Sequence, residues 1–409
     1  MSVPLSRRSL LWGLLAAGVA GSSADAEGVI ELRARPLPAP EGADAFRAAF
    51  YGRIPGPLLR GKQGREILIR VHNELDEGIS VHWHGVRLLN AMDGTVLTQA
   101  PIEPGRRFDY VFVPPDAGTF FYRATASNSL LRARGLHGMF LVEGALEERA
   151  FDVPLVLDDG ELGPLVNGAR QPSIAVPADR PLRLRFLNAA AALAMPLVLS
   201  AEGADVIAFD GQPAEPLRMA AAPFELWPGQ RLDVALPPSR SPVELSMINT
   251  GEAEKLASIL RHGMPVPVAG SAVALKPNPL PDYFNYAASH QLSLTIERGQ
   301  GSRRSWLVNG HRGLSRDPMF SVPRDSTIAL TVDNISRSPH VLHLHGHAAS
   351  LIELAGRFIE TPVWRDTFLV KPLEPAKLLF IADNPGKWLI ASTLPRIFDE
   401  GLAAWFEVT

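Results

Sequence analysis

Short runs in which apolar and polar residues alternate recur along the whole chain, and turn-forming residues bound each run. A period of two is typical of β-strands, so the sequence predicts many of them. We expect strands at EILIRVHN (66–73), FDYVFVP (108–114), LRLRFLN (182–188), RLDVALP (231–237), IALTVDN (328–334) and KLLFIAD (377–383). A sustained helical period is almost absent, and the segment that we expect to be helical is short, Ala253 to His262. The pattern indicates an all-β protein of sandwich type.

Two longer patterns recur at intervals of roughly a domain length. A strand that ends in Asn occurs as REILIRVHNEL (65–75), RPLRLRFLNAA (180–190) and STIALTVDNIS (326–336). A turn that enters a strand occurs as PIEPGRRFDYVF (101–112), LWPGQRLDVAL (226–236) and KPLEPAKLLFIA (371–382). We therefore infer three related β-sandwich domains and a Pro-rich linker before the third. Their predicted bounds are 27–147, 148–263 and 285–409, with the linker at 264–284.

The first 26 residues have the features of an export signal and not of a folded element. Arg7 and Arg8 precede an apolar run that is too short to span a bilayer comfortably, and Ala24-Asp25-Ala26 fits a cleavage site. The paired arginines in SRRSLL are similar to a twin-arginine signal, which directs the export of folded proteins. We expect a periplasmic protein whose mature chain has no transmembrane segment.

Composition excludes several kinds of chemistry. The net charge is −3 and the chain has no basic block, which argues against a nucleic-acid partner. The chain has no cysteine. It can therefore form no disulfide, no iron–sulfur cluster and no thiolate-ligated metal centre.

The histidines are concentrated in two motifs, VHWHG and HVLHLHGH, which fall in the first and third predicted domains. Residues i and i+2 of a strand share a face, so His82 and His84 point one way, as do His343 and His345. A single His-x-His pattern favours a surface strand. Two such pairs in different domains favour an arrangement in which neutral imidazoles face each other and surround a metal ion.

Further motifs accompany the histidines: MDGTVLTQAPIEPG (92–105), GTFFYRA (118–124), LWPGQRLDV (226–234), WRDTFLV (364–370) and DNPGKW (383–388). In this combination the chain resembles the multicopper oxidases, the family that includes laccases, over essentially its whole mature length. The resemblance implies an all-β fold of three consecutive cupredoxin-like (plastocyanin-like) Greek-key β-sandwich domains. It also implies the sites of the family, a type 1 copper that takes electrons from substrate and a trinuclear cluster that reduces dioxygen to water.

The resemblance assigns five retained ligand positions. His82 and His343 match the two type 2 ligands, His84 and His345 each match one type 3 ligand, and His340 matches a type 1 ligand. The type 2 position therefore keeps both ligands, which leaves two alternatives open. Either these imidazoles hold one Cu²⁺ or Zn²⁺ ion, with His84 or His345 as a further ligand, or they form a metal-free hydrogen-bonded cluster.

The cysteine and six other ligand positions of the family are replaced. Where the family has Tyr-His-Ser-His, this chain has Tyr122-Arg123-Ala124-Thr125, and where the family has His-Cys-His it has Ala391-Ser392-Thr393. The next type 1 His falls on Ile397 and the axial Met on Leu402. We expect no type 1 copper, with His340 as a hydrogen-bonded core residue. The Arg123 guanidinium either opposes a nearby cation or pairs with Asp93 or another acid.

Three functions follow from this reading. The first is a non-enzymatic scaffold with a protein partner in the cell envelope, similar to copper-free, twin-arginine-exported members of the family, one of which protects the bacterial division septum. The second is a copper-binding oxidoreductase or metal carrier that uses the residual histidine site. The third is laccase-type turnover, against which the missing cysteine argues. Fold alone does not choose between them.

Overall fold

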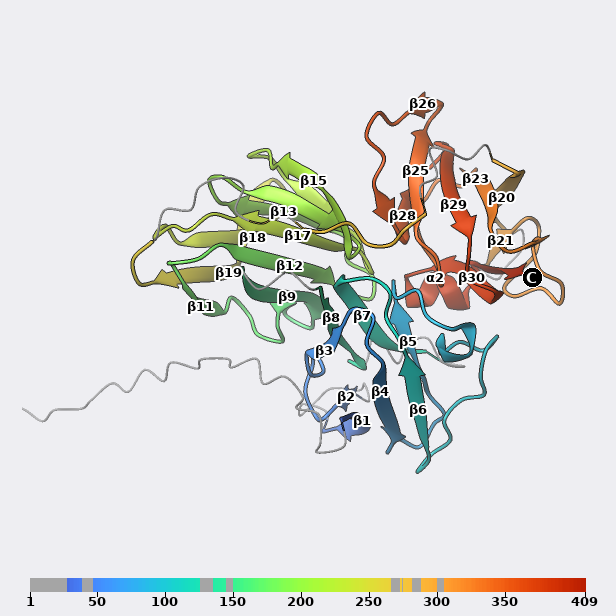
Figure 1. Ribbon diagram of the computed structural model, residues 1–409, viewed down its shortest axis with the longest axis horizontal. Helices are drawn as coiled ribbons and strands as arrows, with labels where there is room; N and C mark the ends of the chain where they lie inside the picture. Colours follow the sequence, from blue (N-terminus) through green and yellow to red (C-terminus); the bar gives the residue numbers. More distant parts are fainter. Residues whose placement is uncertain are drawn as a thin grey trace, which may run out of the picture.

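The computed structural model describes residues 28–38, 47–125, 135–144, 150–265, 273, 275–281, 288–299 and 305–409. Almost every regular element in these residues is a strand, and six sheets form three sandwiches that follow one another along the chain (Figure 1). The all-β prediction is therefore correct. The predicted export signal and much of the predicted linker lie outside the described residues. Within them, no helix is long and apolar enough to cross a membrane.

The first sandwich combines a sheet of order β2-β1-β4-β6 with one of order β3-β8-β7-β5. Its strands are β1 (Val29–Leu37), β2 (Arg47–Phe50), β3 (Leu59–Lys62), β4 (Ile67–Asn73), β5 (Ser80–His84), β6 (Arg107–Phe112), β7 (Gly118–Thr125) and β8 (His137–Glu143). Burial alternates along β4, as its sequence predicts. Trp83 lies in the core among the rings of Tyr110, Phe112 and Phe140. One face of β5 therefore anchors the strand, while its histidines point the other way.

The second sandwich pairs sheets of order β10-β9-β12-β17-β14-β15 and β11-β19-β18-β13-β16. Its strands are β9 (Phe151–Gly160), β10 (Gly163–Val166), β11 (Ser173–Pro177), β12 (Leu182–Asn188), β13 (Met195–Ser200), β14 (Asp205–Phe209), β15 (Gln212–Arg218), β16 (Phe224–Leu226), β17 (Arg231–Leu236), β18 (Val243–Asn249) and β19 (Glu252–His262). Strands β12 and β17 are buried along their whole length. Apolar residues of the first and second domains share one core cluster, so these two domains pack tightly together.

The helix expected at Ala253 to His262 is wrong, because this segment is strand β19. It pairs with β18 on one side and β11 on the other. A register shift opposite the segment leaves the adjacent Leu256 and Ala257 both buried. Because of this break in alternation, the sequence pattern did not indicate a strand. Strand pairing on both edges outweighs the helix propensity of the Glu, Ala, Lys and Leu residues in this segment.

The third sandwich pairs sheets of order β21-β20-β23-β29-β25-β26, with β27 against β25, and β22-β31-β30-β24-β28. Its strands are β20 (His290–Arg298), β21 (Trp306–Val308), β22 (Ser321–Val322), β23 (Ser326–Asn334), β24 (His340–Leu344), β25 (Ala349–Leu354), β26 (Arg357–Phe358), β27 (Trp364–Arg365), β28 (Thr367–Val370), β29 (Ala376–Ala382), β30 (Gly386–Ser392) and β31 (Ala403–Val408). The helices among the described residues are one 3₁₀ turn, η1 (Asn90–Met92), in the first domain and α2 (Pro395–Asp399) in the third.

The recurring asparagine makes the same contacts in all three sandwiches. Each side-chain oxygen accepts from the backbone N–H two residues later, and each amide donates to two carbonyls. One of those carbonyls lies at the start of the second recurring pattern. The pairs are Asn73 with Ile102, Asn188 with Leu226 and Asn334 with Val370. The two sequence patterns thus belong to one structural unit. In it, the Asn at the end of one strand is hydrogen-bonded to the turn that leads into another strand.

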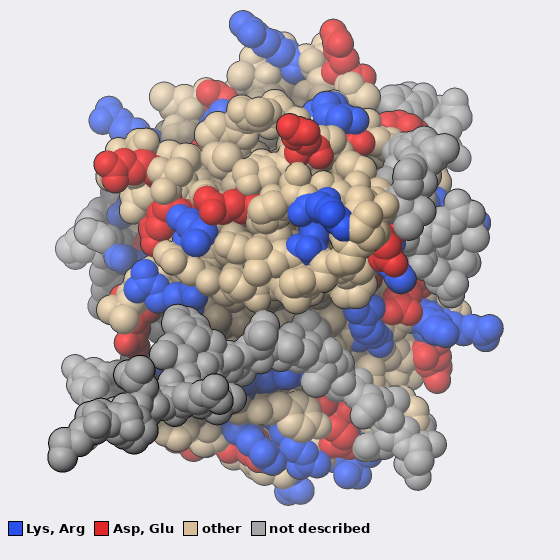
Figure 2. All heavy atoms as spheres, turned by 90° about the vertical axis from the view of Figure 1, so that its left-hand side faces the viewer, with Lys and Arg blue, Asp and Glu red and all other residues tan. Residues whose placement is uncertain are grey.

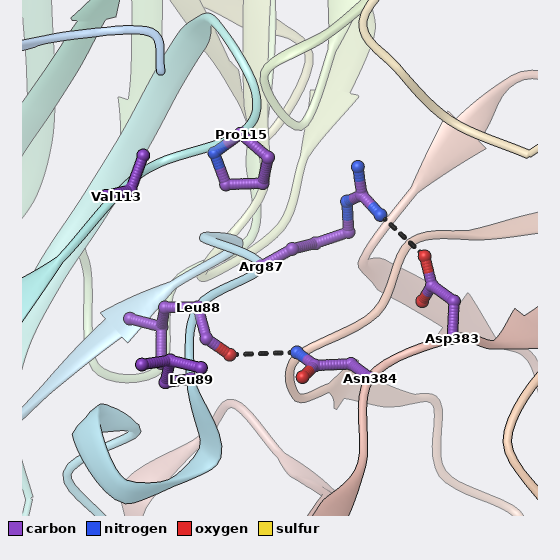
Figure 3. Close-up of a pocket in the computed structure, with 7 residues that line it drawn as sticks. All are labelled: Arg87, Leu88, Leu89, Val113, Pro115, Asp383 and Asn384. Carbon is purple, nitrogen blue, oxygen red and sulfur yellow. Dashed lines mark hydrogen bonds and ion pairs between the residues drawn. The ribbon is translucent and has the colours of Figure 1, made fainter. Parts of the chain in front are cut away.

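A side chain just after β5 fixes the first domain against the third. Arg87 donates to the carboxylate of Asp383, and Asn384 donates to the Leu88 carbonyl (Figure 3). Arg87 also donates to the carboxylate of Asp116. Arg87 also donates to the carbonyl of Pro279 in the linker. These contacts border a surface cleft of about 380 Å³ and hold β5 in place beside the third domain.

Candidate functional site

Strands β5 and β24, with the residue that follows β24, bring four histidines together where the first and third domains meet. All four are buried: His82, His84, His343 and His345. Nε2 of His82 lies 3.2 Å from Nε2 of His343. The ring of His84 stacks on His343 and the ring of His82 stacks on His345, with centroids 3.6 and 4.0 Å apart. The residues that strand alternation placed on facing surfaces therefore form one cluster.

Two buried aspartates orient these imidazoles. Nδ1 of His82 donates to the Asp93 carbonyl at 2.9 Å, and Nδ1 of His345 lies 3.1 Å from the Asp93 carboxylate. Nδ1 of His343 donates to the Asp366 carbonyl at 3.1 Å. Burial acts to raise the pKa of Asp93, but the neighbouring imidazoles of His345 and His82 hold it well below its usual range. Both aspartates are therefore carboxylates that fix the ring orientations.

These contacts determine which nitrogens carry hydrogen. Nδ1 of His82 and Nδ1 of His343 face only oxygen acceptors, so each is an N–H donor. Their Nε2 atoms then turn lone pairs toward each other at 3.2 Å, which is unfavourable unless a proton or a cation lies between them. Nitrogens that share one zinc ion at about 2.0–2.1 Å have a similar separation. Ligand atoms of His82, His343 and His345 all lie within 4.8 Å of one another, so these residues fit a single ion.

His84 faces a different partner. Its Nε2 lies 2.8 Å from the hydroxyl of Thr367 and 3.3 Å from the carboxylate of Asp366. His84, His343 and Asp366 form a second possible ligand group. Of the two alternatives for a further ligand beside His82 and His343, the geometry favours His345.

The replaced type 3 positions do not fit a coupled copper pair. Arg123 lies opposite His82 in the β5–β7 register, and Ala391 lies opposite His343 in the β24–β30 register. Thr125 donates its hydroxyl to the Gly94 carbonyl. These side chains present a cation, a methyl group and an occupied hydroxyl, where the family has imidazoles. None of these three side chains supplies an imidazole to a copper pair.

The pair between Arg123 and Asp93, one of the alternatives that the sequence left open, is not among the hydrogen bonds and ion pairs of the described residues. Within the residues that the structure describes, Nε of Arg123 has no hydrogen-bond partner. The Asp93 carboxylate lies against His82 and His345. Burial lowers the pKa of His343 to about 4, and the Arg123 charge acts in the same direction. The Arg123 charge thus opposes a cation beside His343, while the Asp93 charge acts to raise the pKa of Arg123 against the effect of burial.

His340 lies on the opposite face of β24, in the core of the third domain. Its Nε2 is 3.3 Å from the Ser336 hydroxyl, and its ring meets Trp306 edge-on at 4.3 Å. Leu402 is fully buried in the same core, and Ile397 packs against it. Both side chains, at positions that the resemblance assigns to type 1 ligands, thus contribute hydrocarbon to this core.

One guanidinium in the second domain contacts all three domains, and sequence reasoning missed it. Arg231 donates to the Asp366 carboxylate of the third domain, to the Thr119 carbonyl of the first and to the Asp210 carbonyl of its own. Gly85 leaves the necessary space, because a Cβ there would lie 2.2 Å from Nη2 of Arg231. The motifs LWPGQRLDV and WRDTFLV contain both charges, but nothing local links them.

Buried histidines make the protein sensitive to acid. Burial lowers the pKa of His340, His343 and His347 to about 4, from 6.5 in an exposed imidazole. The unfolded state therefore binds more protons between about pH 6.5 and 4, and stability falls as the pH drops through this window. Asp210 offsets part of the loss, because burial raises the pKa of this carboxyl to about 6.

We expect His347→Phe to reduce this pH dependence by about one proton, since the ring lies among Phe380, Trp388 and Phe406. Urea unfolding at several pH values between about 7 and 4.5 measures the slope. His311→Gln, at an exposed position, serves as the control and should keep the wild-type slope. An unchanged slope in His347→Phe would contradict the assignment.

Comparison with known proteins gives matches along the whole chain. Family models described as multicopper oxidase match residues 39–147 and 283–409. Multicopper oxidase MmcO of Mycobacterium tuberculosis is 27% identical over 428 residues, which cover 85% of this chain and 81% of MmcO. A multi-copper oxidase from Pseudomonas thermotolerans superimposes with a TM-score of 0.81 at 27% identity, covering 93% of this chain and 99% of that one. Lac15 from a marine microbial metagenome gives a TM-score of 0.76 at 30% identity, covering 93% and 100%. The predicted fold class of three consecutive cupredoxin-like domains is confirmed.

Proposed function

This chain belongs to the multicopper oxidase family, and we propose that it acts as a non-enzymatic scaffold or interaction protein and not as a laccase-type oxidase. The observation that carries the proposal is the absence of cysteine from the chain. A thiolate is the strongest ligand of a blue-copper site. Ser392 stands in its place, and its hydroxyl accepts from the backbone N–H of Leu394. Electrons from a substrate would have no copper to enter.

The histidine cluster supports this proposal because it already performs a structural task. His345 is hydrogen-bonded to Asp93 across the boundary of the first and third domains, and His84 is hydrogen-bonded to Thr367 across the same boundary. Buried polar groups that find such partners stabilise the arrangement that they join. The fold can thus retain these histidines for domain contact, without any turnover.

We further propose that the chain is exported to the periplasm by the twin-arginine route and meets a protein partner in the cell envelope. The sequence around Arg7 and Arg8 supports the route. The end of the molecule formed by the second domain carries charges of both signs, interspersed over a broad uncharged surface (Figure 2). Such a surface suits a protein better than a polyanion. A role in cell division rests on family analogy alone.

One observation favours a second candidate function, a single copper or zinc ion used for oxidation or metal carriage. Two Nε2 lone pairs converge at 3.2 Å, with His345 as a third possible ligand. A bound copper ion would supply redox chemistry and a zinc ion would supply a Lewis acid. Asp93 and Asp366 would hold the ligating rings in orientation.

We expect the protein, purified from cells grown with excess copper, to oxidise neither phenols nor diamines, and to melt at nearly the same temperature after chelation. Activity assays check the first point, and thermal melting before and after chelation, with metal analysis, checks the second. One tightly held ion per chain, lost in His343→Ala and retained in the control His72→Ala, would support the second candidate. Oxidation that tracks with bound copper and disappears in His82→Ala would overturn the scaffold proposal.

A further inference from the structure

A half-open pocket of about 350 Å³ lies where the second domain meets the third. Its lining is mostly apolar and includes Val206, Leu217, Met219, Phe224, Leu226 and Leu232. These residues belong to the second sandwich, several of them to its core, so the pocket opens into one end of that core. Among the described residues of the third domain, one side chain contributes to the lining, Arg365 from β27.

Arg365 is a half-buried cation whose guanidinium N–H groups are available as hydrogen-bond donors. Its guanidinium lies over the ring of Phe209, 4.3 Å from the centroid. In the described part of the chain it makes no hydrogen bond and no ion pair. Two carboxylates act on its charge, Asp210 and Asp366, and both are occupied by backbone N–H groups and by Arg231. A guanidinium carries five N–H donors, so this one can still bind an acceptor in the pocket.

The fold produces this arrangement through a tight hairpin between β14 and β15. Asp210 and Gly211 form its turn with φ values of 50° and 81°, the left-handed values of a two-residue hairpin turn. The turn sends the Asp210 carboxylate into the interior and leaves the Phe209 ring beside β27. Strand β15 also contacts β27, so the pocket wall and the guanidinium are held together.

We propose that this pocket binds a small monocarboxylate with an apolar body, the carboxylate on Arg365 and the body against the apolar wall. A guanidinium matches a carboxylate in a two-bond geometry, and the desolvated side of Arg365 strengthens such a pair. The volume is at the lower end of the range for ligand pockets, about 300–1,000 Å³, which favours one ring or a short chain over a peptide. Burial lowers the pKa of Arg365, a cost that a bound carboxylate would offset. This inference is independent of the scaffold proposal.

Isothermal titration with cinnamate and octanoate tests the proposal on the unmodified protein, with cinnamyl alcohol and acetate as comparison ligands. We expect at least one of the two apolar acids to bind, the alcohol to bind about tenfold more weakly, and acetate not to bind at millimolar concentration. Equal binding of acid and alcohol would overturn the role of Arg365. Failure of both acids to bind at millimolar concentration would overturn the site.

Variants locate the binding. Arg365→Met should weaken binding of the acid about tenfold or more, whereas Arg357→Met, at an exposed position in the same domain, should leave it unchanged. Leu217 lies at the edge of the pocket and is 61% exposed, so its substitution spares the fold. Leu217→Glu should bind the acid several-fold more weakly than Leu217→Lys, because the added charges act oppositely on a carboxylate. Wild-type affinity in Arg365→Met, or equal affinity in the Leu217 pair, would contradict the proposal.

Discussion

Arg231→Met is expected to lower the free energy of unfolding by about 3–5 kcal/mol. The guanidinium is fully buried, and it contributes most to holding the pKa of Asp366 well below its usual range against the effect of burial. Its removal leaves that carboxylate without its cation, and it also strips donors from the Thr119 and Asp210 carbonyls. The loss of one buried partner costs more than the pair contributes when intact, because the other charge stays buried.

Urea unfolding of both proteins measures the difference. Arg218→Met is the matched control, because Arg218 also pairs with an aspartate, Asp205, but is 68% exposed. We expect the control to change the free energy of unfolding by less than about 1 kcal/mol. Equal effects of the two substitutions would show that the pair at Arg231 is no more important than a surface pair.

Ser392→Cys alone is expected to give no strong visible absorption with copper, whereas Ser392→Cys combined with Ile397→His and Leu402→Met is expected to give it. A blue-copper site needs a thiolate and two imidazoles, and this chain retains only one of the three, His340. Nδ1 of His340 has no hydrogen-bond partner among the described residues, so it is available to a metal. Visible spectra of the two variants, loaded with copper, check the prediction.

Dioxygen reduction should stay absent in the triple variant. Arg123, Thr125, Ala391 and Thr393 still occupy the type 3 positions, and electrons that entered through the new thiolate would find no coupled copper pair. Oxygen consumption, measured with an oxygen electrode, is compared with the visible absorption of the same copper-loaded variant. Colour without oxygen consumption is the expected result, and sustained consumption would mean that the residual histidines suffice for turnover.

The sequence predicts most strands because successive side chains of a strand point to opposite faces, which gives short alternating or apolar runs between turns. LRLRFLN coincides with β12, and IALTVDN falls within β23. Strand β19 escaped prediction because its burial pattern depends on a bulge and on pairing partners that are distant in sequence. Local patterns report the faces of a strand but not its neighbours.

The candidate site also contains residues that a local sequence pattern predicts and residues that it does not. The two His-x-His motifs carry a local signal, and the structure brings all four imidazoles together. Arg231 and Asp366 are 135 residues apart in the sequence, and no local pattern around either residue predicts their contact. The failure of Arg123 to pair with Asp93 likewise follows from competition by His82 and His345, which only the folded arrangement reveals.

The position of Asp366 also bears on the time at which the interior can close. The ribosome completes the first two domains long before it reaches this residue, and until then the Arg231 guanidinium has no carboxylate from the third domain. A nascent chain therefore holds an unfinished interior, open to water, through the last third of its synthesis. The contact between the second and third domains at Arg231 is therefore expected to be among the last parts of the interior to form.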